Sequence, residues 1–272
     1  MFRALLTHPL TRELDPDNPD AVAVFRKIVR NKRYLGKIYD EWYKMIVASL
    51  PLVPGRVLEL GSGPGFMSDY IPDLITSDFM QIPGISLVFD AHEMPFARDS
   101  LRAIVMTDVL HHLRSPRVFF NEATRCMERG GRIIMIEPWT TAWSSIVYSK
   151  LHHEPFDPET HEWSFPSKGP LSGANGALPW IIFSRDFALF EQEFPQWQLR
   201  TLKPMMPFSY LLSGGLSLRS LVPGSGFALI RRAENLLDPW IHKLAMFAHI
   251  VLELIEPLSS CEDRPHPPWG LK

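Results

Sequence analysis

The chain has 272 residues, a formal net charge of −2 at pH 7, and 46% hydrophobic residues. This length suffices for one α/β domain with a sizeable buried core, and the near-neutral charge argues against nucleic acid or an anionic membrane as a standing partner. The two cysteines, Cys126 and Cys261, have no metal-binding spacing, so we expect reduced thiols and a cytoplasmic protein.

The N-terminal region, residues 1–55, is predicted to hold an irregular arm followed by two helices. Asp20 can cap the first helix, and residues 31–50 place apolar side chains at helical spacing up to Pro51, which ends the second. The first twenty residues lack the apolar core of a signal peptide, and the apolar stretch 244–255 is too short to span a bilayer.

Residues 56–66 combine a short apolar run with glycines at alternate positions. The run 56–60 is typical of a buried parallel strand, and the sequence Gly61-Ser62-Gly63-Pro64-Gly65 is typical of a tight turn. Glycines let a ligand approach the backbone where a Cβ would intrude. The spacing differs from the Gly-x-Gly-x-x-Gly dinucleotide pattern, so the loop alone is weak evidence. We expect a helix to begin just after it, at residues 67–71.

Four further strands are predicted before residue 139. They cover residues 74–78, 85–89, 102–106 and 130–138, and the first two end at or next to an acid, Asp78 and Asp90. Asp78 follows Glu59 by nineteen positions, close to the spacing at which a carboxylate meets a ribose diol. Because strands alternate with intervening segments of helical length, the sequence predicts an open parallel sheet that gathers ligands at the carboxyl ends of its strands.

The segments described above resemble the class I S-adenosylmethionine-dependent methyltransferases, and in particular the type 11-like group. The likeness covers residues 56–138 and rests on four segments in register, namely 59–65, Asp78, 90–96 and 109–113. The resemblance implies an α/β fold, a Rossmann-like doubly wound sheet of seven strands with an antiparallel last strand. It also implies S-adenosyl-L-methionine as the cofactor.

The resemblance also assigns roles within a cofactor site. The expected cofactor-binding residues are Glu59, Gly61, Gly63, Gly65, Asp78, Asp90, Ala91, Thr107 and Asp108. The glycines would line the methionyl and ribose portions while the glutamate orders their turn. Asp78 would accept both ribose hydroxyls, and Asp90, with Ala91 beside it, would accept the adenine amine. Thr107 and Asp108 would contact the amino acid end of the cofactor.

The implied reaction is a displacement at the sulfonium methyl group, with the nucleophile in line at roughly 3 to 3.5 Å in a dry pocket. His111 and His112 follow the fourth strand, and a histidine titrates near neutrality, so either can take a proton from an acceptor. A structural role under the sheet edge is an equal alternative for His111 and the favoured one for His112. Transfer to a carboxylate or a neutral amine needs no base.

A long segment, residues 139–182, follows the fifth strand and is expected to form a lid and acceptor pocket over the ligand side of the sheet. Its ionisable residues can be considered as a metal cluster: His152, His153, Glu154, Asp157 and His161. Their spacing fits no standard zinc pattern, so we interpret them as loop polarity and expect no metal site. We predict instead that a histidine of this segment, His153, serves the acceptor as a catalytic base alongside His111.

The remaining chain, residues 183–258, would complete a single domain. Ser184 can cap a helix, residues 197–204 read as the sixth strand, and by the resemblance 245–254 would be the antiparallel seventh. An insertion at 205–243 is apolar and broken by glycines, which suits a core, a dimer interface or a wall for a lipophilic acceptor, the core being favoured. The proline-rich tail, 259–272, is expected to be unstructured.

We therefore expect a methyltransferase acting on a small-molecule acceptor, including a glycan- or lipid-linked one. A nicotinamide-dependent oxidoreductase is an alternative, disfavoured because the 90–96 segment has no role there and the chain has no Tyr-x-x-x-Lys pair. A non-catalytic cofactor-binding scaffold is another, disfavoured because it has no need of the three loop glycines together with both aspartates. The acceptor, the need for a base and the oligomeric state are left open by the sequence.

Overall fold

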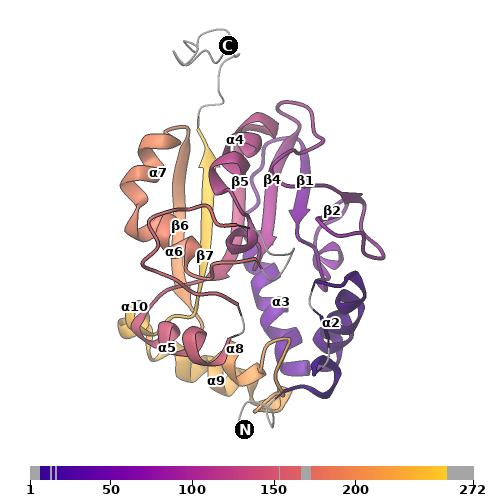
Figure 1. Cartoon of the computed structure of the whole chain (residues 1–272), viewed down its shortest axis with the longest axis vertical. Helices are drawn as coiled ribbons and strands as arrows, with labels where there is room; N and C mark the ends of the chain where they lie inside the picture. The colour runs from indigo at the N-terminus through magenta and orange to yellow at the C-terminus, as the bar shows by residue number, and fades with distance from the viewer. Residues whose placement is uncertain (1–6, 13, 16, 153, 167–172, 256–272) are drawn as a thin grey trace.

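A computed structural model describes residues 7–255, except 13, 16, 153 and 167–172. A single seven-stranded sheet runs through the described residues in the order β3-β2-β1-β4-β5-β7-β6 (Figure 1). The tail predicted at 259–272 and the predicted catalytic His153 lie outside the described residues.

The sheet is parallel except at β7. Its strands are β1 (Arg56–Leu60), β2 (Ile75–Asp78), β3 (Leu87–Val88), β4 (Leu101–Thr107), β5 (Met127–Pro138), β6 (Trp197–Met205) and β7 (Phe247–Leu254). β7 pairs antiparallel with both β5 and β6, whereas β1 pairs in parallel with β2 and β4. The predicted seven strands and the antiparallel last strand are confirmed. The strand order changes direction between β1 and β4: β2 and β3 follow on one side of β1, and β5 follows on the other side, beyond β4. A ligand crevice is therefore expected between the carboxyl ends of β1 and β4.

Nine α-helices occur in the described residues. They are α2 (Pro19–Asn31), α3 (Arg33–Ala48), α4 (Pro116–Cys126), α5 (Ala142–Leu151), α6 (Leu178–Trp180), α7 (Phe187–Glu193), α8 (Ser209–Ser213), α9 (Phe227–Asn235) and α10 (Ile241–Leu244). Two predicted caps are wrong. Asn18 rather than Asp20 caps α2, because Pro19 suits the first helical position and the Asn18 side chain accepts from the Asp20 amide. Ser184 lies within a π-helical turn, and α7 begins after Asp186.

The helix predicted directly after the glycine loop is also wrong. Only a short 3-10 helix, η2 (Met67–Asp69), forms there, and within the described residues no α-helix lies between β1 and β4. Pro72 follows closely and Asp73 has a positive φ of 60°, so the chain turns before a second helical turn can form. The third strand is likewise shorter than predicted, with two residues in β3.

The sheet is apolar on both faces because its strands alternate between two buried clusters. Leu58 and Ile104 face one cluster, and their neighbours Val57 and Val105 face the other. Helices α4, α6 and α7 contribute side chains to the first cluster, and α3 and α5 to the second. In Figure 1, α2, α5, α8, α9 and α10 gather beyond the end of the sheet to which the parallel strands point.

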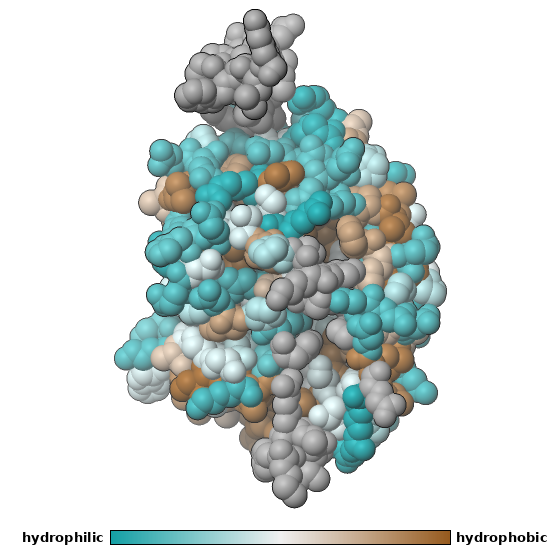
Figure 2. Space-filling model, viewed as in Figure 1, coloured by the Kyte–Doolittle hydropathy of each residue, from teal (hydrophilic) through white to brown (hydrophobic). Residues whose placement is uncertain are grey.

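The outer surface seen in Figure 2 is largely hydrophilic, with hydrophobic residues along the side on which β2 lies. Phe79, Leu87 and Val88 are exposed in this part of the fold. The short edge strand β3 leaves little backbone available for pairing with another chain. No helix among the described residues is both long and apolar enough to cross a membrane.

Lys32, at the end of α2, holds the 205–243 segment against the N-terminal helices. Its Nζ donates hydrogen bonds to the carbonyl oxygens of Ser213 at 3.1 Å and Gly215 at 2.6 Å, and also to that of Leu218. Three carbonyls from one loop therefore share a single charged donor. Because hydrogen bonds to a charged group are stronger than neutral ones, this contact fixes the loop's position.

Replacing Lys32 should test this anchoring. We expect Lys32→Met to lower the free energy of unfolding by about 1 to 3 kcal/mol, because buried carbonyl groups lose their donor. Chemical denaturation of the purified variant measures the change. Lys27→Met, an exposed lysine on α2, is the matched control and should leave stability unchanged. Equal stability of the two variants would show that Lys32 does not anchor the loop.

Candidate active site

A cavity of about 300 Å³ opens at the carboxyl ends of the central strands. Seven of the nine predicted cofactor-binding residues line it: Gly61, Gly63, Asp78, Asp90, Ala91, Thr107 and Asp108. The other two, Glu59 and Gly65, lie behind this lining. The remaining walls come from α2 and α3, from α5 with the residues after it, and from the 205–243 insertion.

Glycine occupies the three loop positions for different physical reasons. Gly61 has a φ of +63°, and a Cβ there would lie 2.6 Å from a methyl carbon of Val109. A Cβ on Gly65 would lie 2.7 Å from the hydroxyl oxygen of Tyr43. For Gly63, with a φ of +43°, the nearest protein atom would be 3.7 Å away, in ordinary contact. Gly61 and Gly65 therefore allow close packing, whereas Gly63 leaves space on the side of the cavity.

Glu59 orders the turn from inside the protein. Its Oε2 accepts a hydrogen bond from Ser62 Oγ at 2.7 Å, and its backbone carbonyl accepts one from Ser77 Oγ at 2.7 Å. The Ser62 amide in turn donates to the carbonyl of Ser77 at 2.8 Å. These bonds join the glycine loop to β2. Burial raises the pKa of Glu59 to about 7.

Asp78 lies at the end of β2 and contacts the glycine loop directly. Its Oδ2 accepts a hydrogen bond from the Gly63 amide at 3.1 Å, and its Oδ1 accepts one from the Met80 amide at 3.0 Å. Burial raises the pKa of Asp78 above its ordinary value. The Asp78 carboxylate and the glycine loop are therefore in direct contact.

Asp90 lies on the same cavity, beyond β3. Its Oδ1 accepts from the His92 amide at 2.9 Å, and its Oδ2 accepts from Arg114 Nη2 at 2.9 Å. Burial opposes ionisation of Asp90, but the hydrogen bonds from His92 and the charge of Arg114 outweigh it and lower the pKa. Asp90 is therefore an ionised acceptor held in a fixed orientation.

The end of β4 presents two partly buried polar side chains to the cavity. Thr107 Oγ1 is buried and has no hydrogen-bond partner within the described residues. Asp108 adopts a positive φ of 66°, and its amide donates to the Ile136 carbonyl at 2.8 Å. Burial raises the pKa of Asp108 to about 7. A buried hydroxyl is stabilised by a hydrogen-bond partner, which a polar group of a bound ligand can supply.

His111, predicted as a catalytic base, is fully buried in η3 (Leu110–His112) and does not line the cavity. Its Nδ1 lies 2.8 Å from Glu137 Oε2, and its Nε2 lies 3.4 Å from Glu154 Oε2. Burial opposes protonation, but the two carboxylates outweigh it and raise the pKa of His111 well above its usual range. His111 therefore lies behind the side chains that a bound molecule would contact.

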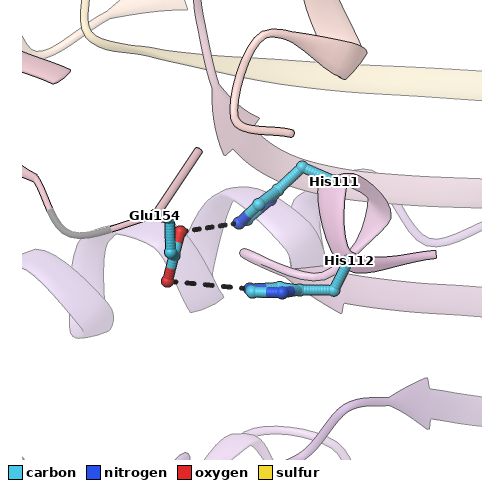
Figure 3. A group of neighbouring side chains, drawn as sticks. All are labelled: His111, His112 and Glu154. Carbon is cyan, nitrogen blue, oxygen red and sulfur yellow. Dashed lines mark ion pairs between the residues drawn. The ribbon is translucent and has the colours of Figure 1, made fainter. Parts of the chain in front are cut away.

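His112 lines the cavity together with His152 and Glu154. Its Nε2 lies 3.9 Å from Glu154 Oε1, and Figure 3 shows both histidine rings pointing at this one carboxylate. Burial, together with the neighbouring His111, lowers the pKa of His112 to about 3. The sequence did not predict this group, because His112 follows β4 whereas Glu154 follows α5, so the two are far apart along the chain. The signal that could have found it is that both segments begin at the same edge of the sheet.

The segment 139–182 is divided between two locations. Val147, Tyr148 and Leu151 of α5 line the cavity, whereas Ile181 and Ile182 belong to the core on the opposite face of the sheet. The 205–243 insertion adds further apolar lining, with Tyr210, Leu211 and Leu216. Of the three tyrosines on α3, Tyr39 lines the cavity, whereas Tyr34 packs on Phe227 and Tyr43 packs on Phe66.

A glycine loop and two strand-end aspartates lie around one cavity at the switch point of this sheet. This is where α/β proteins with such a sheet bind nucleotide-type cofactors. Residues 58–135 match the family model described as a methyltransferase domain. No curated protein matches the chain.

Solved structures share the fold at low sequence identity. The geranyl diphosphate C-methyltransferase of Streptomyces coelicolor, solved with S-adenosyl-L-homocysteine, matches with a TM-score of 0.50 and 12% identity, over 92% of this chain and 91% of that one. A SAM-dependent methyltransferase from Thermotoga maritima matches with a TM-score of 0.47 and 14% identity, over 85% of this chain and 99% of that one.

Residues 58–135 are thus a methyltransferase domain, and the fold is that of the class I S-adenosylmethionine-dependent methyltransferases, which use S-adenosylmethionine as their cofactor. The resemblance stated from the sequence is confirmed. The oxidoreductase and scaffold alternatives are set aside.

The raised pKa of Glu59 predicts a pH effect on the ligand-free protein. The folded state holds the proton up to about pH 7, whereas an unfolded glutamate releases it near its ordinary pKa of 4.5. The folded state therefore binds more protons between these values, and the contribution of Glu59 to stability falls as pH rises through this window. Denaturant unfolding measures the free energy of unfolding at pH 5 and at pH 7.5. This free energy should fall less between the two pH values for Glu59→Gln than for the parent chain. Parallel pH profiles would contradict the assignment.

Proposed function

We propose that the chain transfers the methyl group of S-adenosylmethionine to a lipophilic small-molecule acceptor by in-line displacement. The observation that carries this proposal is the division of one cavity into two chemically different halves. One half, at the ends of β1, β2 and β4, offers carboxylates, a hydroxyl and an open glycine. The other half, from α5 and the 205–243 insertion, offers aliphatic and aromatic side chains.

In the polar half, each predicted cofactor contact has a group suited to it. Asp78 is fixed beside Gly63, where its carboxylate can accept both ribose hydroxyls. Asp90, with Ala91 beside it, keeps an ionised acceptor for the adenine amine. Thr107 and Asp108 face the amino acid end of the cofactor, and the unpartnered Thr107 hydroxyl would gain a hydrogen bond there.

In the apolar half, the lining favours a hydrocarbon-rich acceptor over a glycan. Glycan sites need many polar partners, since sugar hydroxyls must keep their hydrogen bonds when water leaves. The lining from α5 and from residues 210–216 is mostly aliphatic and aromatic, and it includes Leu151, Leu211 and Leu216. The polar groups on this side are concentrated at His112, His152 and Glu154, which suits an acceptor with one polar end.

The methyl transfer itself requires mainly position and dryness. The buried His111 does not line the cavity but lies beside Glu154, so we replace its predicted catalytic role by that of orienting this carboxylate. Glu154 lines the cavity and is placed to hold the acceptor's polar end. The cofactor's methyl group would then face that end across the cavity.

The cofactor contact of Asp78 can be measured directly. We expect Asp78→Ala to weaken S-adenosylhomocysteine binding by about 1 to 3 kcal/mol, because charge-assisted bonds to two hydroxyls are lost. Tryptophan fluorescence titration gives the affinity, and the exposed Asp69→Ala serves as the matched control. NADH should cause no saturable quenching. Normal affinity in Asp78→Ala would show that this side chain is not the ribose ligand.

The acceptor class can be tested with a series of para-alkyl phenols and methyl-labelled S-adenosylmethionine. We expect kcat/KM to rise about fourfold for each added methylene that is buried, which corresponds to about 0.8 kcal/mol. Leu211→Asp should flatten this dependence while leaving S-adenosylhomocysteine affinity unchanged. Transfer to water-soluble glycosides in preference to every alkyl phenol would overturn the lipophilic assignment.

A further inference from the structure

We propose that His111, His112 and Glu154 bind a divalent transition-metal ion, with zinc as the best-fitting ion, at the acceptor end of the cavity (Figure 3). This inference goes beyond the proposed function, because the ion's binding does not depend on the identity of the acceptor.

The three side chains lie close enough to one another to share one ion. His111 Nε2 lies 3.4 Å from one Glu154 oxygen, and His112 Nε2 lies 3.9 Å from the other. Both distances exceed the 2.7 to 3.2 Å range of a normal N–H···O hydrogen bond. Tetrahedral zinc with bonds of about 2.0 to 2.2 Å places its ligand atoms about 3.4 Å apart. One ligand atom from each of the three residues lies within 4.8 Å of the others.

His111 is already oriented as a metal-binding histidine. Its Nδ1 pairs with Glu137 Oε2, which leaves Nε2 directed at Glu154. This Nε2 is fully buried and makes no hydrogen bond within the described residues. The second oxygen of Glu137 accepts hydrogen bonds from the amides of Val109 and Leu110, at 2.9 and 2.7 Å. A carboxylate that fixes the far nitrogen of a histidine is the usual support for a metal ligand.

The ligand set indicates an ion that interacts with a bound molecule. Two histidines and one glutamate are a ligand set of catalytic zinc sites, in which the fourth position remains open. His112 and Glu154 line the cavity, and His111 lies behind them. The open position therefore faces the cavity. A hard oxygen ligand of the acceptor fits there, and this part of the inference rests on the proposed function.

This inference replaces the expectation that the chain has no metal site. That expectation considered only the spacing of residues 152–161, which indeed fits no zinc pattern. The ligands instead come from two distant segments, the turn after β4 and the segment after α5. A relay of hydrogen bonds among the same groups, with no ion, is the alternative to be distinguished.

The test uses the full chain, stripped of metal with a chelator and then dialysed. Titration with Zn²⁺ alone should show uptake of one ion per chain. Titration with Co²⁺ should give the visible absorption bands of a tetrahedral site. Neither measurement depends on activity, so a failure of the proposed function leaves this result interpretable. Binding of S-adenosylhomocysteine, followed in parallel, reports on the cofactor half of the cavity separately.

Variants identify the ligands. Loss of a supporting residue alone costs about 10- to 100-fold in metal affinity, so His112→Gln and Glu154→Gln should each weaken Zn²⁺ binding at least about tenfold. The exposed His242→Gln and Glu159→Gln are matched controls and should bind normally. Thermal melting checks the fold of every variant, and since the two ligand variants lie in different segments, either alone is informative. Absence of uptake in the parent chain, or normal uptake in both ligand variants, would overturn the proposal.

Discussion

The carboxylate of Glu137 is the contact on which the acceptor end of the cavity depends. It lies at the end of β5, fully buried, and accepts two backbone amides and one ring nitrogen from the turn that follows β4. A buried carboxylate is costly unless its oxygens are satisfied, and here both oxygens are. The turn is therefore held in a single conformation, which positions His111 and His112 and permits the positive φ of Asp108.

Carboxylates also bind turns at the ends of other strands. Glu59 binds the Ser62 hydroxyl below the glycine loop, and Asp78 binds the amide of Gly63 across from it. Carboxylates accept without donating, so they suit the outward-facing amides of tight turns. Burial raises the pKa of Glu59 and of Asp78, because it disfavours the ionised form of each side chain. The ligand edge of the sheet is thus organised by acids that bind the groups of its turns.

The sequence predicted the parts of the fold that follow from short-range pattern. Apolar strands with alternating contacts, the glycine loop and the two aspartates were located correctly because each is encoded within a few residues. The α-helix predicted at residues 67–71 does not form. Pro72 and the positive φ of Asp73 act just beyond the window in which residues 67–71 appear helical. The exact cap of α2 was missed for a similar reason, because Asp20 and Asn18 are equally good candidates by type.

The acceptor end could not be predicted in the same way, because its residues approach one another only in the folded chain. From the sequence, His112 is a possible base with a structural role favoured, and Glu154 is loop polarity. Only the sheet order brings the two residues to one edge. The apolar wall has the same origin: Lys32 binds the loop that carries Gly215 and Leu218, so the N-terminal helices determine where the 205–243 insertion meets the cavity. The cofactor contacts that we propose therefore lie within a short stretch of sequence, residues 59–108. The proposed acceptor lining depends instead on contacts among α2, α5 and the insertion, which are distant in sequence.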